Sequence, residues 1–230
     1  VLVSMGPDRF VVLNVPVVPA KDNLRADTNR VVIDGDKFVG YTDSWSTGFH
    51  RSTIAGAFRR VKAEDHKEMV RRMLSKGNNK FKVDSFTVAG REDRNAPFHL
   101  KAWWSIGDIV RTGNGEQYVN LHLDRPFLDR LYRESRKVGV ENDHTSAFTS
   151  VTILQVPKGA KVTHVPEPSS FKDERFSYTI TYEVLPGEVR CIGQFDEERI
   201  YLSVEDLAVW RTMLKKLRSD MDRSVVLRIQ

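Results

Sequence analysis

Cysteine is nearly absent from this sequence, since Cys191 is the single one among 230 residues. One cysteine cannot form an internal disulfide or build a multi-cysteine zinc site. No apolar run approaches the roughly 20 residues that a membrane-spanning helix needs, and the first residues lack the pattern of a signal peptide. With 40% apolar and 29% charged residues, the composition is globular. We expect a mature chain or an excised piece that folds around an apolar core.

Several patterns that carry chemistry are also missing. The six histidines show no i, i+2 or i, i+4 pair, so we expect no metal site. Asp34-Gly35-Asp36 lacks the further oxygen ligands of a calcium loop and is typical of a hairpin turn. Gly113-Asn114-Gly115 is not followed by Gly-Lys-Ser/Thr, and Ser169-Ser170 has no flanking nucleophile-elbow glycines. The residues alone therefore predict no cofactor and no catalytic set.

Basic charge is concentrated in one segment. Residues 51–82 carry ten Lys or Arg and three Asp or Glu, while the rest of the chain is close to neutral. Such a patch can bind nucleic acid, an anionic glycan or an anionic lipid. The alternative is the solvated face of two amphipathic helices, which we favour because aromatic side chains for base stacking do not interleave the basic ones. The candidate binding residues of this segment are Arg59, Arg60, Arg71 and Arg72.

Hydrophobic periodicity predicts an α+β part over residues 1–125. A first strand is expected over residues 10–16, followed by a hairpin over residues 30–42. Helical spacing then predicts a pair of helices, near residues 54–61 and 63–74, the second ended by Gly77. From residue 81 to 123 the period changes to two, which indicates an antiparallel meander beside the helix pair.

The C-terminal part, residues 140–230, is predicted to be rich in β-strands. Residues 125–146 form a connection with a short helix near 127–134, and we place a soft domain boundary there. Alternating strands follow, with a sandwich-like sheet covered by a helix over residues 203–218. Ser203 and Asp206 form a capping-box pattern at the start of that helix. The sequence is compatible with two independent domains and with one continuous body.

Two consecutive tryptophans suggest a binding surface. Trp103 and Trp104 lie in a predicted strand, so their side chains point to opposite faces. Either one is buried and the other exposed, or both are buried, one in each layer. An exposed tryptophan near basic residues could stack on a sugar ring or on a partner's side chain. We take Trp103 and Trp104 as candidate binding residues.

The order of the elements resembles a known family. The landmarks are the hairpin around Val31–Asp36, the loop through Gly48 into the helix pair, the turns Pro157-Lys158-Gly159 and Val165-Pro166-Glu167-Pro168, the hairpin around Gly187, the helix from Ser203 and the strand Val225–Ile229. In this order they resemble the C-terminal, non-catalytic part of bacterial transglutaminase-like proteins. That family belongs to the papain-like cysteine peptidase superfamily and carries flanking domains of unknown function.

The resemblance implies an accessory module and a periplasmic or secreted location, without excluding the cytoplasm. The implied partner is the catalytic domain of the same parent protein or an envelope substrate. The family's nucleophile is a cysteine that opens a helix, whereas Cys191 lies in the middle of a predicted strand. No catalytic residue therefore carries over, and we expect Cys191 to be a small core residue.

Three functions follow from these observations. The first is a non-catalytic binding or scaffolding module for a transglutaminase-like catalytic domain at the bacterial envelope. The second is a free-standing hydrolase for an anionic substrate, which predicts a cleft where titratable groups converge. The third is a nucleic-acid binder that uses residues 51–82. A non-enzyme is favoured over an enzyme, and neither the ligand nor the oligomeric state follows from the sequence.

Overall fold

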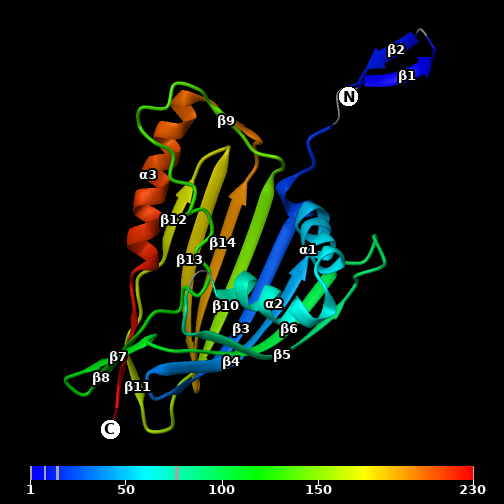
Figure 1. Cartoon of the computed structure of the whole chain (residues 1–230). Coiled ribbons are helices and arrows are strands. Elements are labelled where there is room, and N and C mark those ends of the chain that lie inside the picture. The colour runs from blue at the N-terminus through cyan, green and yellow to red at the C-terminus, as the bar shows by residue number, and fades with distance from the viewer. Residues whose placement is uncertain (1, 8, 14–15, 76–77, 230) are drawn as a thin grey trace.

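One eight-stranded sheet forms the centre of the molecule (Figure 1). The computed structural model describes residues 2–7, 9–13, 16–75 and 78–229. The strand order is β12-β13-β14-β10-β3-β4-β6-β5, and neighbours are antiparallel except for the parallel pair β3 and β10. The strands are β3 Leu24–Asp34, β4 Lys37–Ser46, β5 Phe81–Ala89, β6 Phe98–Ile106, β10 Ser146–Gln155, β12 Ser169–Lys172, β13 Phe176–Leu185 and β14 Glu188–Glu197.

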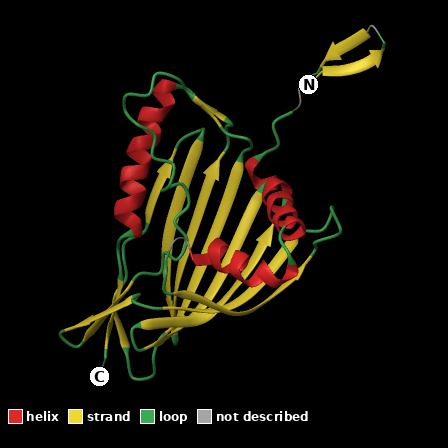
Figure 2. Ribbon diagram, in the orientation of Figure 1, coloured by secondary structure: helices red, strands yellow, loops and turns green. Residues whose placement is uncertain are grey.

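Smaller elements surround this sheet. A four-stranded sheet of order β11-β16-β8-β7 and two strand pairs, β1–β2 and β15–β9, complete the strands. Their bounds are β1 Leu2–Gly6, β2 Arg9–Val12, β7 Val110–Gly113, β8 Glu116–Val119, β9 Val140–Glu141, β11 Lys161–His164, β15 Tyr201–Leu202 and β16 Val225–Arg228. The helices are α1 Gly48–Arg60, α2 His66–Ser75 and α3 Val204–Met221, with 3-10 turns at Ala20–Asp22 and Ala63–Asp65 (Figure 2).

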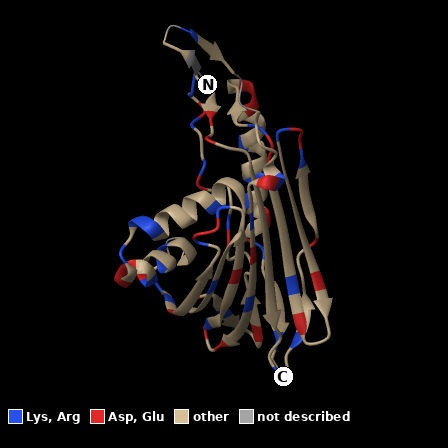
Figure 3. Ribbon diagram, turned by 90° about the vertical axis from the view of Figure 1, so that its right-hand side faces the viewer, with Lys and Arg blue, Asp and Glu red and all other residues tan. Residues whose placement is uncertain are grey.

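The helices lie on one face of the central sheet, which we call the inner face (Figure 3). Phe58 of α1 packs on Phe98 of β6 with ring centroids 5.5 Å apart, and both side chains are buried. At the other end of the sheet, Trp210 of α3 meets Phe176 of β13 edge to face, at 5.0 Å. The buried apolar side chains form one cluster on the inner face, which lies beneath α1 and α2 at one end of the sheet and beneath α3 at the other.

Local sequence signals explain why these elements begin and end where they do. The tight turn between β3 and β4 places Gly35 at φ +63°, a conformation that glycine adopts without strain. At the start of α3, the Ser203 side chain accepts from the Asp206 backbone N–H, and the Asp206 carboxylate accepts from the Ser203 backbone N–H. This confirms the predicted capping box, which satisfies two backbone donors at the helix start.

A seam of buried polar side chains crosses the middle of the inner face, on β3, β4 and β10. Asp27 is 1% exposed, pairs with Arg25 at 2.5 Å and accepts a 2.5 Å hydrogen bond from the Ser44 hydroxyl. Burial raises the pKa of the Asp27 carboxyl, and the Arg25 guanidinium opposes that rise. Such groups are tolerated in a core because they are paired. Thr42 extends the seam, since it donates to Asn29 Oδ1 at 2.6 Å.

The predicted α+β, β-rich fold with a long helix near the C-terminus is confirmed. The predicted helix near residues 127–134 is wrong, because these residues form turns and irregular backbone, with Phe127 at φ +68°. The C-terminal strands also extend the sheet of the N-terminal part instead of building a separate one. The backbones of β3 and β10 pair from Leu24↔Ala147 to Val32↔Gln155.

Parts of two expectations lie outside the described residues. The strand expected over residues 10–16 appears as β2 up to Val12, and residues 14–15 are not among those described. Gly77, expected to end the second helix, is likewise outside them. Among the described residues, no helix combines the length and the apolarity that crossing a membrane requires.

The shared sheet generates a prediction about the two sequence-defined parts. Expressed separately, residues 1–139 and 140–230 should each fail to unfold cooperatively, because each fragment exposes a long central strand edge together with its share of the buried seam. Mixing the fragments should restore a cooperative transition. Circular dichroism and urea denaturation measure both, with the intact chain as control. A sharp transition in either isolated fragment would instead identify an independent domain.

Candidate binding sites

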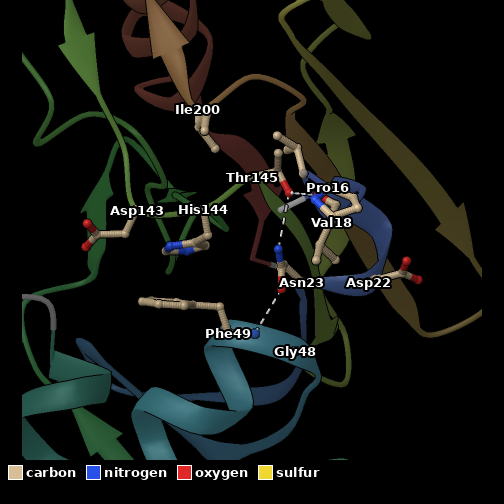
Figure 4. A pocket seen from close by; sticks show the side chains of 11 residues that line it. Pro16, Val18, Asp22, Asn23, Gly48, Phe49, Asp143, His144, Thr145 and Ile200 are labelled. Atoms are coloured by element: carbon tan, nitrogen blue, oxygen red, sulfur yellow. Dashed lines mark hydrogen bonds between the residues drawn. The ribbon is translucent and has the colours of Figure 1, made fainter. Parts of the chain in front are cut away.

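A pocket of about 580 Å³ opens where the chain enters the central sheet (Figure 4). Three segments that are distant in sequence form most of its wall, namely residues 16–23, the start of α1, and the loop before β10, and Ile200 adds a fourth. The pocket is mostly apolar with a few polar groups, as is usual for ligand sites. Its lining residues are Pro16, Val17, Val18, Asp22, Asn23, Gly48, Phe49, Asp143, His144, Thr145 and Ile200.

Asn23 holds the three segments together. Its side-chain amide donates to the Thr145 hydroxyl at 3.2 Å, and its side-chain oxygen accepts from the Phe49 backbone N–H at 2.9 Å. Thr145 in turn donates to the Val18 carbonyl at 2.6 Å. Gly48 adopts φ +52°, and a Cβ at this position would collide with Asn23 Oδ1. The pocket wall is therefore fixed by hydrogen bonds and by a backbone turn that favours glycine.

Two histidines lie side by side at this pocket. The His144 ring stacks on Phe49 with centroids 3.7 Å apart, as Figure 4 shows, and meets the His50 ring edge-on at 5.2 Å. Burial, with a smaller contribution from His144, lowers the pKa of His50 to about 4. Burial and the nearby Arg130 also lower the pKa of His144. Both rings are therefore neutral at pH 7, and the His144 ring forms part of the pocket wall.

His50 also contacts a hydroxyl group. Its Nε2 atom lies 2.8 Å from Ser146 Oγ, which is a distance at which a histidine can activate a serine nucleophile. Ser146 is 5% exposed, however, and neither residue lines the pocket. A general base also works best with a pKa near the operating pH, and that of His50 is about 4. The pair is suited to packing rather than to acyl transfer.

The lone cysteine lies in a second buried group. As the sequence predicts, Cys191 is a core residue, at 3% exposed. Its sulfur is 3.8 Å from His122 Nδ1, and His122 Nε2 is 2.8 Å from the Tyr182 hydroxyl. Burial raises the pKa of the Cys191 thiol to about 12 and lowers the pKa of His122 to about 4. Both groups are uncharged at neutral pH, so a thiolate nucleophile does not form.

An exposed apolar strip leads away from the pocket. Val17 and Val18 line the pocket and are 54% and 48% exposed. The strand pair β1–β2 stands clear of the central sheet in Figures 1 and 2. We define the N-terminal strip as the large apolar side chains of this region, Phe10, Val11, Val12, Leu13, Val17 and Val18, which are 40% to 70% exposed.

The predicted tryptophan pair splits between the two faces of β6. Trp104 is 2% exposed on the inner face, whereas Trp103 is 37% exposed on the opposite face. The candidate arginines belong to α1 and α2, which cover the inner face. The structure thus separates Trp103 from the basic segment, because alternate residues of a strand point to opposite sides of the sheet.

Several basic side chains of residues 51–82 form ion pairs or hydrogen bonds with other residues of the chain. Arg71 and Arg72 both bind the Glu68 carboxylate, at 2.6 and 2.9 Å, and these hydrogen bonds lower the pKa of Glu68 to about 2. Arg51 is buried and donates to the carbonyls of Ala96, Gly90 and Asp93. Arg59 and Arg60 remain exposed at the end of α1.

Sequence reasoning missed the histidine pocket. Its residues come from four separate segments of the chain and share no spacing in the sequence. Among residues 2–7, 9–13, 16–75 and 78–229, no group of three or more His, Cys, Asp or Glu is placed to hold a metal ion. Asp143, in Figure 4, directs its carboxylate away from the His144 ring.

The buried histidines generate a pH prediction. The folded-state pKa of His122 is about 4, whereas an unfolded histidine titrates near 6.5. The unfolded chain therefore binds more protons between these values, and stability falls as pH drops through them. Lowering the pH from 7 to 5 should cost about 1–2 kcal/mol of unfolding free energy from His122. Urea denaturation at both pH values measures this.

The matched variants are His122→Gln and, for the solvent-exposed control, His164→Gln. The first should reduce the loss of stability between pH 7 and 5, and the second should leave it unchanged. Each variant is compared with itself at the two pH values, so its absolute stability does not enter. An unaltered pH dependence in His122→Gln would contradict the assignment.

Comparisons with known proteins complete the description of these sites. No protein-family model, no curated protein and no solved structure matches this chain. The resemblance to transglutaminase-like proteins is untested by these comparisons and stays a prediction.

Proposed function

We propose that this chain is a non-catalytic binding module that docks a protein partner through its N-terminal strip and the adjoining histidine pocket. The partner that the sequence resemblance suggests is a transglutaminase-like catalytic domain, and the location that it suggests is the bacterial periplasm or exterior. The observation that carries the proposal is the set of exposed apolar side chains on β2 and at Val17 and Val18, the last two of which also line the apolar pocket.

The strip is costly to leave in water. Phe10 is 64% exposed and Val12 is 70% exposed, and both lie on a two-stranded sheet that pairs with no other described strand. An isolated pair of strands is marginally stable at best. A contiguous exposed apolar surface is characteristic of a protein–protein or membrane interaction site. Covering it would release water from the apolar side chains and stabilise the strand pair.

The open edges of β1–β2 favour a protein over a lipid as the partner. Each edge presents backbone N–H and C=O groups that a neighbouring strand can satisfy by β-addition. In hydrocarbon, the same groups would lack partners at a cost of several kcal/mol each. A partner with both a strand edge and an apolar surface meets both requirements.

The pocket extends the same surface. Val17 and Val18 belong to both the strip and the pocket wall, and the Phe49 and His144 rings form an apolar stack behind them. An apolar side chain of the partner can therefore insert between these residues while the strip is covered. Insertion of a large side chain into a preformed pocket is typical of interface hot spots.

The chemistry of the buried groups supports a binding role over a hydrolytic one. Burial lowers the pKa of His50 and of His122 to about 4, which makes them weak bases at neutral pH, and it raises the pKa of the Cys191 thiol to about 12, which disfavours the thiolate. Reactive nucleophiles in enzymes are partly exposed, and their pKa values are shifted in the opposite direction.

The double variant Phe10→Asp/Val12→Asp tests the docking surface. It should weaken binding of a transglutaminase-like catalytic domain by about 100-fold, since two apolar anchors of about 1.5 kcal/mol each are lost and charges are buried. Biolayer interferometry between the full chain and the purified catalytic domain measures the affinity. Val184→Asp, at a position 53% exposed on β13, is the control and should bind as the unmodified chain does. Equal affinity for all three proteins would reject the proposal.

The choice of partner has its own test. The parent reading frame should encode a domain with a Cys, His and Asp catalytic set before the position of Val1. DNA sequence upstream of this segment provides the measurement. A reading frame without that set would remove the transglutaminase-like partner, while leaving the apolar strip to be tested against other domains of the same protein.

A further inference from the structure

The face of the central sheet turned away from the helices, which we call the outer face, carries an aromatic cluster on β4 and β6. Tyr41 and Trp103 are directly opposite in the strand register, with centroids 6.4 Å apart. Trp45 and His99 form the next aromatic pair along the same strands, stacked at 3.9 Å and 9°. Trp103 is 37% exposed and Trp45 is 47% exposed.

Polar contacts hold these rings in place. Lys101 lies between the pairs, with its ammonium nitrogen 4.7 Å from the Tyr41 centroid and 5.4 Å from that of Trp103. His99 Nε2 is 2.7 Å from Asp43 Oδ1, which fixes the ring against Trp45. Two aromatic platforms are therefore oriented before any ligand arrives, so little ordering entropy remains to be lost on binding.

A groove runs from Trp103 across the sheet to the turn between β13 and β14. Its volume is about 680 Å³. Arg30, Asp84 and Gln155 line it with exposed side chains. These three side chains form no hydrogen bond or ion pair with other described residues, so their donors and acceptors face solvent. The full lining is Arg30, Val31, Val32, Val39, Gly40, Tyr41, Asp84, Trp103, Ile153, Gln155, Pro186, Gly187 and Glu188.

The groove carries charged side chains of both signs and has no excess of positive charge. Arg30 and Glu188 line it together with Asp84, and Lys101 and Asp43 flank the aromatic rings. The exposed arginines of the basic segment belong to the helix layer on the other side of the sheet. A polyanion such as single-stranded nucleic acid needs a net positive path for its phosphates, which this groove does not offer.

We propose that the outer groove binds a neutral oligosaccharide. The apolar C–H face of one sugar ring stacks on Trp103, and its hydroxyl groups exchange hydrogen bonds with Arg30, Asp84 and Gln155. Ring stacking combined with planar polar side chains suits a ligand that is apolar on its faces and polar at its edges.

The spacing of the two platforms sets the length of the ligand. Tyr41 and Trp45 are four residues apart on β4, so the aromatic pairs are separated by roughly 13 Å along the strand. That separation exceeds one sugar ring, so a saccharide of several rings bound at Trp103 also reaches Trp45, which lies outside the groove lining and opposite Ala26 near the start of β3. The backbone of β4 is paired on both sides, to β3 and β6, so a peptide cannot add to it as a strand.

Calorimetry with defined saccharides tests the proposal on the full chain. The probes are the β-1,4-linked tetrasaccharide of N-acetylglucosamine, cellotetraose and maltotetraose, together with a thymidine oligonucleotide of similar length. At least one saccharide should bind saturably in the millimolar range or tighter. Trp103→Ala and Trp45→Ala should each weaken binding about tenfold, the upper range for a stacked aromatic pair.

Controls separate this site from folding and from the docking surface. Trp103→Phe keeps an aromatic ring and should retain most of the affinity, while Tyr201→Ala removes an aromatic that is 55% exposed elsewhere and should have no effect. The Phe10→Asp/Val12→Asp variant should bind the saccharide normally, which distinguishes this inference from the proposed partner docking. The inference is overturned if no saccharide binds at millimolar concentration, if the oligonucleotide alone binds, or if both alanine variants bind as well as the unmodified chain.

Discussion

The histidine pocket and the outer groove both depend on the parallel pairing of β3 with β10. This pairing joins the strands of the N-terminal part to those of the C-terminal part, and it carries the polar seam across the middle of the sheet. At the start of this pair, the Ala147 backbone N–H donates to the Asn23 carbonyl at 3.1 Å. That contact sets the loop before β10 beside the loop before β3, which is why Phe49, His144 and Val18 line a common pocket.

The two proposed binding surfaces lie at opposite ends of the same strand. The pocket adjoins Asn23, just before β3, while the groove adjoins Arg30 and Val32, near its end. The eight residue steps from Leu24 to Val32 span roughly 26 Å of extended strand, and on the outer face Trp45 lies opposite Ala26 within this interval. The proposed protein partner would therefore bind at the strand start, and the proposed saccharide would bind on the outer face of the sheet.

Sequence patterns predicted the regular elements well and the sites poorly. The Asp-Gly turn, the capping box at Ser203 and the alternation across Trp103 and Trp104 each depend on neighbouring residues, so a local signal was present. The helix predicted over Phe127 to Glu134 is absent because the packing of Phe127 against Trp210, with ring centroids 5.3 Å apart, stabilises an irregular loop there. The pocket depends on which strands become neighbours. No local pattern in the sequence signals that β3 pairs with β10.

The long separation between β3 and β10 also has a consequence during synthesis. Roughly a hundred residues must emerge after Asp34 before Ser146 is made, which takes about 5–20 s at ribosomal rates. Throughout that interval the nascent chain can complete β3, β4, α1, α2, β5 and β6 while the far side of β3 has no neighbour. An open interior strand edge invites association with other chains. The emerging polypeptide is thus most exposed to aggregation in the seconds before its last third leaves the ribosome, when a chaperone would protect it best.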